Sequence, residues 1–211
     1  MYELPAILIG YLIGSIPAAY IITRIATGKD IRTLGGGNVG FLNTLREVGG
    51  GAAAVVILVD IGKGFGAVAV AHWLPKVDYP WVIAAAFSAV LGHLWMIWLK
   101  FSGGKGIGTT VGALATLFIL LGYWKLLLIF LGVIIPPLLL TKNVALSMGI
   151  GLVALPFIVW FGTHSGFATL ISIALLLVIM LKFYPTALAA WRKTRKPRDM
   201  IFDNWQKRRD H

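Results

Sequence analysis

Two long apolar runs are separated by the polar stretch Phe101-Ser102-Gly103-Gly104-Lys105-Gly106-Ile107-Gly108-Thr109-Thr110. Four of the six residues from 103 to 108 are glycines, which allow positive φ angles and bring backbone N–H groups close to a ligand. Lys105 adds one positive charge, and Thr109 and Thr110 supply hydroxyl donors at the start of the next apolar run. This combination is typical of an anion site, most often for phosphate. A flexible glycine turn whose lysine reaches the membrane surface is the alternative.

The apolar runs around this stretch predict an all-α membrane protein. Of the 211 residues, 58% are hydrophobic and 13% are charged, whereas soluble domains are roughly 45–50% apolar. A membrane helix needs ~20 apolar residues. We therefore expect a polytopic bundle of about seven transmembrane helices, at 4–25, 52–74, 80–99, 107–122, 124–140, 144–162 and 166–184. The fourth and fifth runs are short, so one bent hairpin near Gly122 is an alternative for this pair.

Basic residues between the runs predict the orientation, because cytoplasmic loops are enriched in lysine and arginine. They gather in the first, third and fifth connections and in the tail after the last run. This pattern places the N-terminus outside and the C-terminus in the cytoplasm. We expect one transmembrane domain, residues 1–185, followed by a basic cytoplasmic tail, residues 186–211.

The net charge of +11 predicts contact with anionic membrane lipids rather than with nucleic acid. The chain has no cysteine, and its four histidines are scattered along the sequence. We therefore expect no metal site, no cofactor and no nucleophilic triad. Any chemistry should rest on positioning and on stabilisation of charge.

A second glycine-rich stretch lies in the first connection, residues 26–51. Gly35, Gly37 and Gly40 match the G-x-G-x-x-G pattern, but no strand precedes them, so this is not a dinucleotide fingerprint. The stretch at 101–110 is not a nucleotide P-loop either, because Gly106 follows the lysine where Ser or Thr coordinates magnesium. Close backbone approach to an anion is the remaining interpretation, with the following side chains as donors: Asn38, Asn43 and Arg46. A solvated loop that meets lipid headgroups is the alternative.

Asp60, Lys63 and His93 lie well inside predicted helices, where charges are costly and normally face a bundle interior. Asp60 and Lys63 are three residues apart, so they share a helix face and can pair. We expect a structural ion pair there, with direct catalysis as the alternative. His93 precedes Gly103 by ten residues and is either a packing group or part of a site.

Taken in order, these motifs resemble those of the PlsY family of bacterial membrane glycerol-3-phosphate acyltransferases, which use acyl-phosphate as the donor. The resemblance runs from the first helix to about Ser147. It implies seven helices, with transfer of a fatty acyl group from acyl-phosphate to glycerol 3-phosphate. It also implies that Lys105 stabilises the departing phosphate and that Arg46 positions the acceptor. The residues it implies for substrate binding are Gly35, Gly36, Gly37, Asn38, Gly40, Asn43, His93, Gly103, Gly104, Gly106 and Thr109.

The sequence departs from the family pattern at three places. Gly36 and Leu42 stand where the family has serine and threonine, and Ala145 stands where it has a substrate-contacting serine. The family's His-Arg-x-Asn stretch is missing after the last helix, at residues 183–186. The alternative function is therefore a non-catalytic membrane protein that binds anionic lipid or phosphate.

Overall fold

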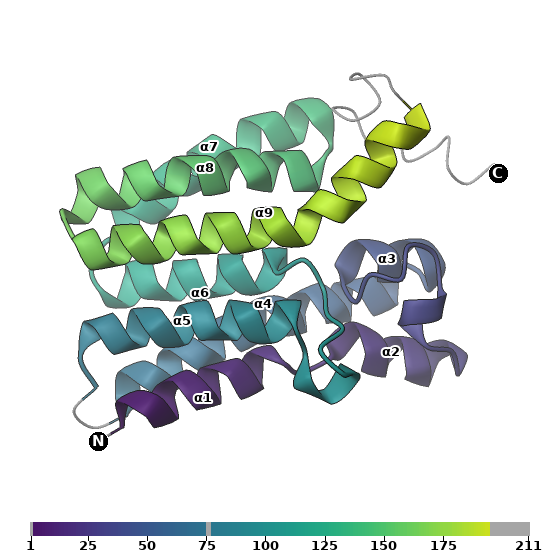
Figure 1. The fold of residues 1–211 in the computed structure, drawn as a ribbon, viewed down its shortest axis with the longest axis horizontal. Coiled ribbons are helices and arrows are strands. Elements are labelled where there is room, and N and C mark those ends of the chain that lie inside the picture. The colour runs from purple at the N-terminus through teal and green to yellow at the C-terminus, as the bar shows by residue number, and fades with distance from the viewer. Residues whose placement is uncertain (1, 75–76, 195–211) are drawn as a thin grey trace. The chain divides into compact units, whose positions relative to one another are not determined.

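The computed structural model describes residues 2–74 and 77–194, which form helices and connecting loops without a strand (Figure 1). The chain divides into two compact units, residues 1–124 and 125–211. The helices of the first unit are α1 (Glu3–Gly14), α2 (Ala18–Thr27), η1 (Ile31–Thr33), α3 (Phe41–Glu47), α4 (Gly50–Trp73), α5 (Tyr79–Leu94), η2 (Ile97–Leu99) and α6 (Ile107–Leu120). Those of the second unit are α7 (Trp124–Thr141), α8 (Val144–Thr163) and α9 (Gly166–Thr194).

Each of the seven predicted apolar runs is helical in the structure. Within the described residues, six stretches are long and apolar enough to cross a membrane: Glu3–Thr27, Gly50–Trp73, Tyr79–Leu99, Trp124–Thr141, Val144–Thr163 and Gly166–Ala189. The fourth run forms the shorter apolar helix Ile107–Leu120. It is separate from α7, and Gly122 makes the turn between them with φ of 78°. The protein is therefore a multi-pass α-helical membrane protein.

Small residues hold the helices of the first unit close together. α1 packs against α5, and α4 packs against α1, α5 and α6 (Figure 1). A Cβ atom at Gly14 would overlap the backbone of Ala89, and one at Gly64 would overlap the backbone of Thr109. Membrane helices rely on such close backbone approach because lipid provides no hydrophobic force between them.

The first predicted helix, 4–25, is wrong in one respect, because it is broken into α1 and α2. The break falls at residues 15–17, where Pro17 has no N–H to donate and disfavours a continuous helix. Two side-chain hydrogen bonds link this region to other helices. Ser15 Oγ donates to the Gly92 carbonyl at 3.3 Å, and Lys63 Nζ donates to the Ile16 carbonyl at 3.1 Å.

The first connection is more ordered than predicted, because residues 26–51 contain η1 and α3 between their loops. α3 packs on α2 and α4 (Figure 1). Its seven residues are too few to be stable alone. Its helicity therefore depends on tertiary contacts, which explains why the sequence pattern did not reveal it.

In the second unit, α8 packs against α9. A Cβ atom at Gly151 would meet the side chains of Ile134 and Phe130, so α7 and α8 also approach closely. α9 continues to Thr194, past the predicted end of the seventh run at 184. The rest of the predicted basic tail, 195–211, lies outside the described residues, so the division at 185 stays a prediction.

Candidate active site

The first glycine loop, defined here as residues 34–40, is held by the amide of Asn43. Asn43 is buried at the start of α3, and its Nδ2 donates to the carbonyls of Ile31 at 3.3 Å and Leu34 at 3.0 Å. Its Oδ1 accepts from the N–H of Gly36 at 3.2 Å. Both ends of the amide therefore bind backbone. A structural role for Asn43 was missed by sequence reasoning, and its predicted contact with substrate stays a prediction.

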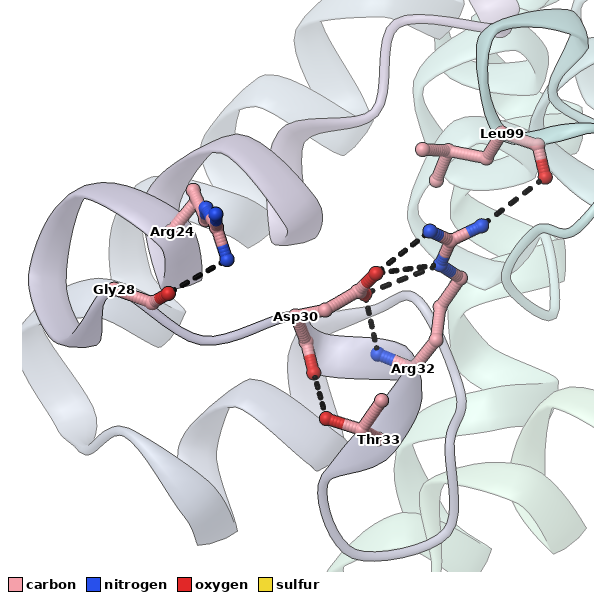
Figure 2. Close-up of polar contacts among 6 residues, drawn as sticks. All are labelled: Arg24, Gly28, Asp30, Arg32, Thr33 and Leu99. Atoms are coloured by element: carbon pink, nitrogen blue, oxygen red, sulfur yellow. Dashed lines mark hydrogen bonds and ion pairs between the residues drawn. The ribbon is translucent and has the colours of Figure 1, made fainter.

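A second set of polar contacts connects η1, which precedes this loop, to the segment after α5. Figure 2 shows Arg32 between the Asp30 carboxylate and the Leu99 carbonyl. Its Nη2 lies 2.6 Å from Asp30 Oδ2, and its Nη1 donates to Leu99 at 3.4 Å. The hydrogen bond from Arg32 lowers the pKa of Asp30 below its usual value. Arg32 and Asp30 were not among the predicted site residues, because nothing in the sequence places Leu99 beside them.

The second glycine loop, defined here as residues 101–106, begins with a strained turn. Lys100 and Phe101 have φ of 54° and 60°, which is uncommon for residues with a Cβ atom. Hydrogen bonds from Phe101 N to the Met96 carbonyl at 2.9 Å and from Ser102 N to the Leu99 carbonyl at 3.1 Å hold this conformation. The loop ends at Gly106, which precedes α6 with φ of 79°. Such strain is found more often at functional sites than elsewhere.

The two glycine loops meet at Gly104. Its N–H donates to the His93 carbonyl at 3.0 Å. A Cβ atom at Gly104 would overlap His93 Nε2 and would lie 2.5 Å from the carbonyl oxygen of Val39 in the first loop. Only a residue without a side chain fits between them. The structure thus brings together Gly104, His93 and the first loop, which are far apart in the sequence.

Two cations approach each other beside this contact. Lys105 is partly buried in the second loop, and Arg46 is exposed in the last turn of α3. Burial lowers the pKa of Lys105, and the nearby positive charge of Arg46 lowers it further. An anion bound next to these groups would offset both effects, so the arrangement suits phosphate.

Asp60 and Lys63 form a buried ion pair in α4, with Lys63 Nζ 2.9 Å from Asp60 Oδ1. The same carboxylate oxygen lies 3.5 Å from Nδ1 of His93, which is buried in the last turn of α5. Sequence reasoning treated His93 separately from this pair. Its link to Asp60 depends on the packing of α5 against α4, for which the sequence carries no direct signal.

The remaining predicted residues lie around these groups. Gly35 and Gly36 are exposed, whereas Gly37 and Asn38 are partly exposed and Gly40 is buried. Gly103 is packed against the carbonyls of His93 and Leu94. At the start of α6, the hydroxyls of Thr109 and Thr110 are buried and have no hydrogen-bond partner among the described residues. In that part of the chain no three His, Asp or Glu side chains gather in a way that could hold a metal ion.

The fold and these loops define a class: a multi-pass membrane protein with two glycine loops and two cations at one place. Residues 4–193 match the family model for glycerol-3-phosphate acyltransferase. The chain is 50% identical over 202 residues to glycerol-3-phosphate acyltransferase 1 of Dehalococcoides mccartyi, covering 96% of this chain and 97% of the relative. It is 39% identical over 184 residues to a glycerol-3-phosphate acyltransferase of Prochlorococcus marinus, covering 87% and 86%.

The chain therefore belongs to the glycerol-3-phosphate acyltransferase family, and the resemblance to PlsY is confirmed. The fold agrees with the crystal structure of PlsY (YgiH), an integral membrane glycerol 3-phosphate acyltransferase, in its glycerol 3-phosphate form. The TM-score is 0.80 at 22% identity, covering 92% of this chain and 94% of that chain. The lysophosphatidic acid form of PlsY has a TM-score of 0.75.

Proposed function

We propose that this protein transfers a fatty acyl group from acyl-phosphate to glycerol 3-phosphate, giving lysophosphatidic acid and inorganic phosphate for phospholipid synthesis. The family relationship supports the reaction. The observation that carries the proposal to this chain is the meeting of the two glycine loops at Gly104, next to Lys105. Both substrates carry phosphate, and the lysine beside this junction offers a positive charge to bind it.

In the proposed reaction, the hydroxyl oxygen of glycerol 3-phosphate attacks the acyl carbonyl carbon. An ester C–O bond forms while the bond from the acyl carbon to the phosphate oxygen breaks. The hydroxyl proton passes to a substrate phosphate, and inorganic phosphate leaves. No covalent enzyme intermediate is needed, so the protein contributes positioning and stabilisation of charge.

The two cations have different roles in this proposal. Lys105 stabilises the negative charge on the departing phosphate, because its ammonium stands among the glycines of the second loop. Arg46 binds the phosphate of the acceptor with its planar guanidinium, which matches phosphate in a bidentate way. The side chains of Asn38 and Thr109 are further donors near the two loops.

The same proposal places the site at the cytoplasmic face of a bacterial inner membrane, with the N-terminus outside. Arg24, Lys29, Arg32 and Arg46 lie in or beside the first connection, and Lys100 and Lys105 lie in the third. This charge bias supports a cytoplasmic position for both glycine loops.

The test is an assay of the purified protein with acyl-phosphate, with and without glycerol 3-phosphate. We expect release of inorganic phosphate that depends on the acceptor, together with an equal amount of lysophosphatidic acid. Arg46→Ala should raise KM for glycerol 3-phosphate more than it lowers kcat. A folded wild-type protein without turnover would instead support a non-catalytic protein that binds anionic lipid or phosphate.

A further inference from the structure

His93 lies between the Asp60 carboxylate and the second glycine loop. It is 2% exposed, and its ring and backbone contact different partners. Nδ1 lies 3.5 Å from Asp60 Oδ1, while the backbone carbonyl accepts the N–H of Gly104 at 3.0 Å. A single residue thus joins the buried ion pair of α4 to the loop that carries Lys105.

The contact with Asp60 bears on which nitrogen of the His93 ring carries the proton. The 3.5 Å separation is an ion-pair distance rather than a hydrogen bond, and the negative charge of the carboxylate favours the form in which the facing nitrogen, Nδ1, carries the proton. In the neutral ring this leaves Nε2 as an acceptor on the opposite edge. That edge faces Gly104, because a Cβ atom there would overlap Nε2 and would lie 2.9 Å from Cε1.

Asp60 is itself held firmly. Its Oδ1 pairs with Lys63, whose ammonium also donates to the Ile16 carbonyl at the break between α1 and α2. The start of α6 rests on the same residue, because a Cβ atom at Gly108 would lie 3.0 Å from Asp60 Cβ. Gly104 therefore packs against His93, and Gly108 packs against Asp60. Lys105 lies between these two supports in the sequence.

We propose that His93 is a positioning residue, held by Asp60 through Nδ1, whose opposite ring edge sets the place of Gly104 and hence of the Lys105 ammonium. This inference rests on the proposed function, and it assigns His93 to the support of the loop rather than to the substrate. Losing a residue that orients a metal ligand typically costs about 10–100-fold in activity, and we expect a loss of the same order here.

A double-mutant cycle tests the coupling between His93 and Lys105. His93→Asn should lower kcat by about 10–100-fold. In the Lys105→Ala background the same change should lower kcat by less than about twofold, because coupled residues are not additive. Equal losses in both backgrounds, or full activity of His93→Asn, would overturn the inference. His72→Asn, in the last turn of α4, is the matched control and should keep wild-type kcat. An inactive wild type would reject the proposed function instead.

A second measurement uses the wild-type fold and needs no variant at position 93. Histidine labelled with 15N gives signals from four residues, and His93 is assigned by removing His72, His164 and His211 one at a time. We expect a neutral ring with the proton on Nδ1, and a shift of Nε2 when inorganic phosphate is added. A proton on Nε2, or no response to phosphate at saturation, would refute the positioning role even if the enzyme is active.

Discussion

At the residue scale, Lys105 is a partly buried lysine that lies near a second positive charge, Arg46. Burial and the charge of Arg46 both disfavour its ammonium form, as the lowered pKa indicates. The cost of this arrangement is offset when a phosphate binds, since an anion favours the charged form.

Lys105→Ala should lower kcat/KM for acyl-phosphate by about 10²–10³-fold, the usual effect of removing one well-placed electrostatic contact. Lys105→Arg should remain impaired, because the planar guanidinium differs in shape from a compact ammonium and the glycine loop leaves little room. Steady-state kinetics and thermal melting on the same samples check this. Undiminished activity of Lys105→Ala would contradict the proposed mechanism.

The lowered pKa also predicts the pH dependence. An ordinary lysine titrates near ~10.4, and Lys105 titrates below its usual value. Because the charged form is the active one, kcat/KM should fall as the pH rises through this lowered pKa. The profile of kcat/KM reports the free enzyme. Lys105→Arg should lose the fall on the basic side, since arginine stays charged. A wild-type profile that stays flat beyond the ordinary lysine pKa would contradict this assignment.

At the scale of elements, the buried ion pair connects α4 to three other helices. Lys63 binds the carbonyl at the break after α1, Asp60 faces His93 of α5, and Gly108 of α6 packs on Asp60. The spacing of Asp60 and Lys63 predicted that the two residues could pair, and the structure has them 2.9 Å apart. Their further partners depend on how the helices pack, so the sequence did not predict them.

Asp60→Asn should destabilise the detergent-solubilised protein by about 3–5 kcal/mol, because it leaves the buried charge of Lys63 without its counter-ion. Asp60→Asn combined with Lys63→Met should recover much of the melting temperature. The recovery should be incomplete, since Lys63 also donates to the Ile16 carbonyl. Thermal unfolding of the single and double variants measures this. Additive losses would indicate that the pair contributes no coupling.

At the scale of the whole molecule, the orientation that the basic residues predict stays a prediction, and the connections between the helices offer positions at which to test it. Seven apolar stretches, one of them short, place Ser102 and Ser165 in the third and sixth connections. Consecutive connections alternate between the two faces of the membrane, so these two positions should lie on opposite sides.

Single cysteines at Ser102 and Ser165 test the orientation, because the chain has no native cysteine. In intact cells, a reagent that does not cross the membrane should label position 165 and leave position 102 unlabelled. Both positions should react after the cells are opened, which controls for accessibility. The reverse pattern in intact cells would contradict a cytoplasmic site.

The sequence by itself determined the class of protein, the seven apolar helical runs and the main candidate loops. Runs of about 20 apolar residues and clustered basic residues are local signals, and they depend on the lipid environment rather than on contacts within the fold. The glycines around Lys105 are a local signal of the same kind. Family motifs then linked these loops to phosphate-bearing substrates before any contact was known.

The tertiary structure alone decided what each polar group touches. Gly104 meets the Val39 carbonyl, and His93 faces Asp60. Asn43 binds backbone at both ends of its amide. The first helix breaks at residues 15–17, where the Ile16 carbonyl accepts a hydrogen bond from Lys63. Each of these depends on residues brought together from separate segments by helix packing. Composition and spacing describe one segment at a time, so they carry no information about such partners.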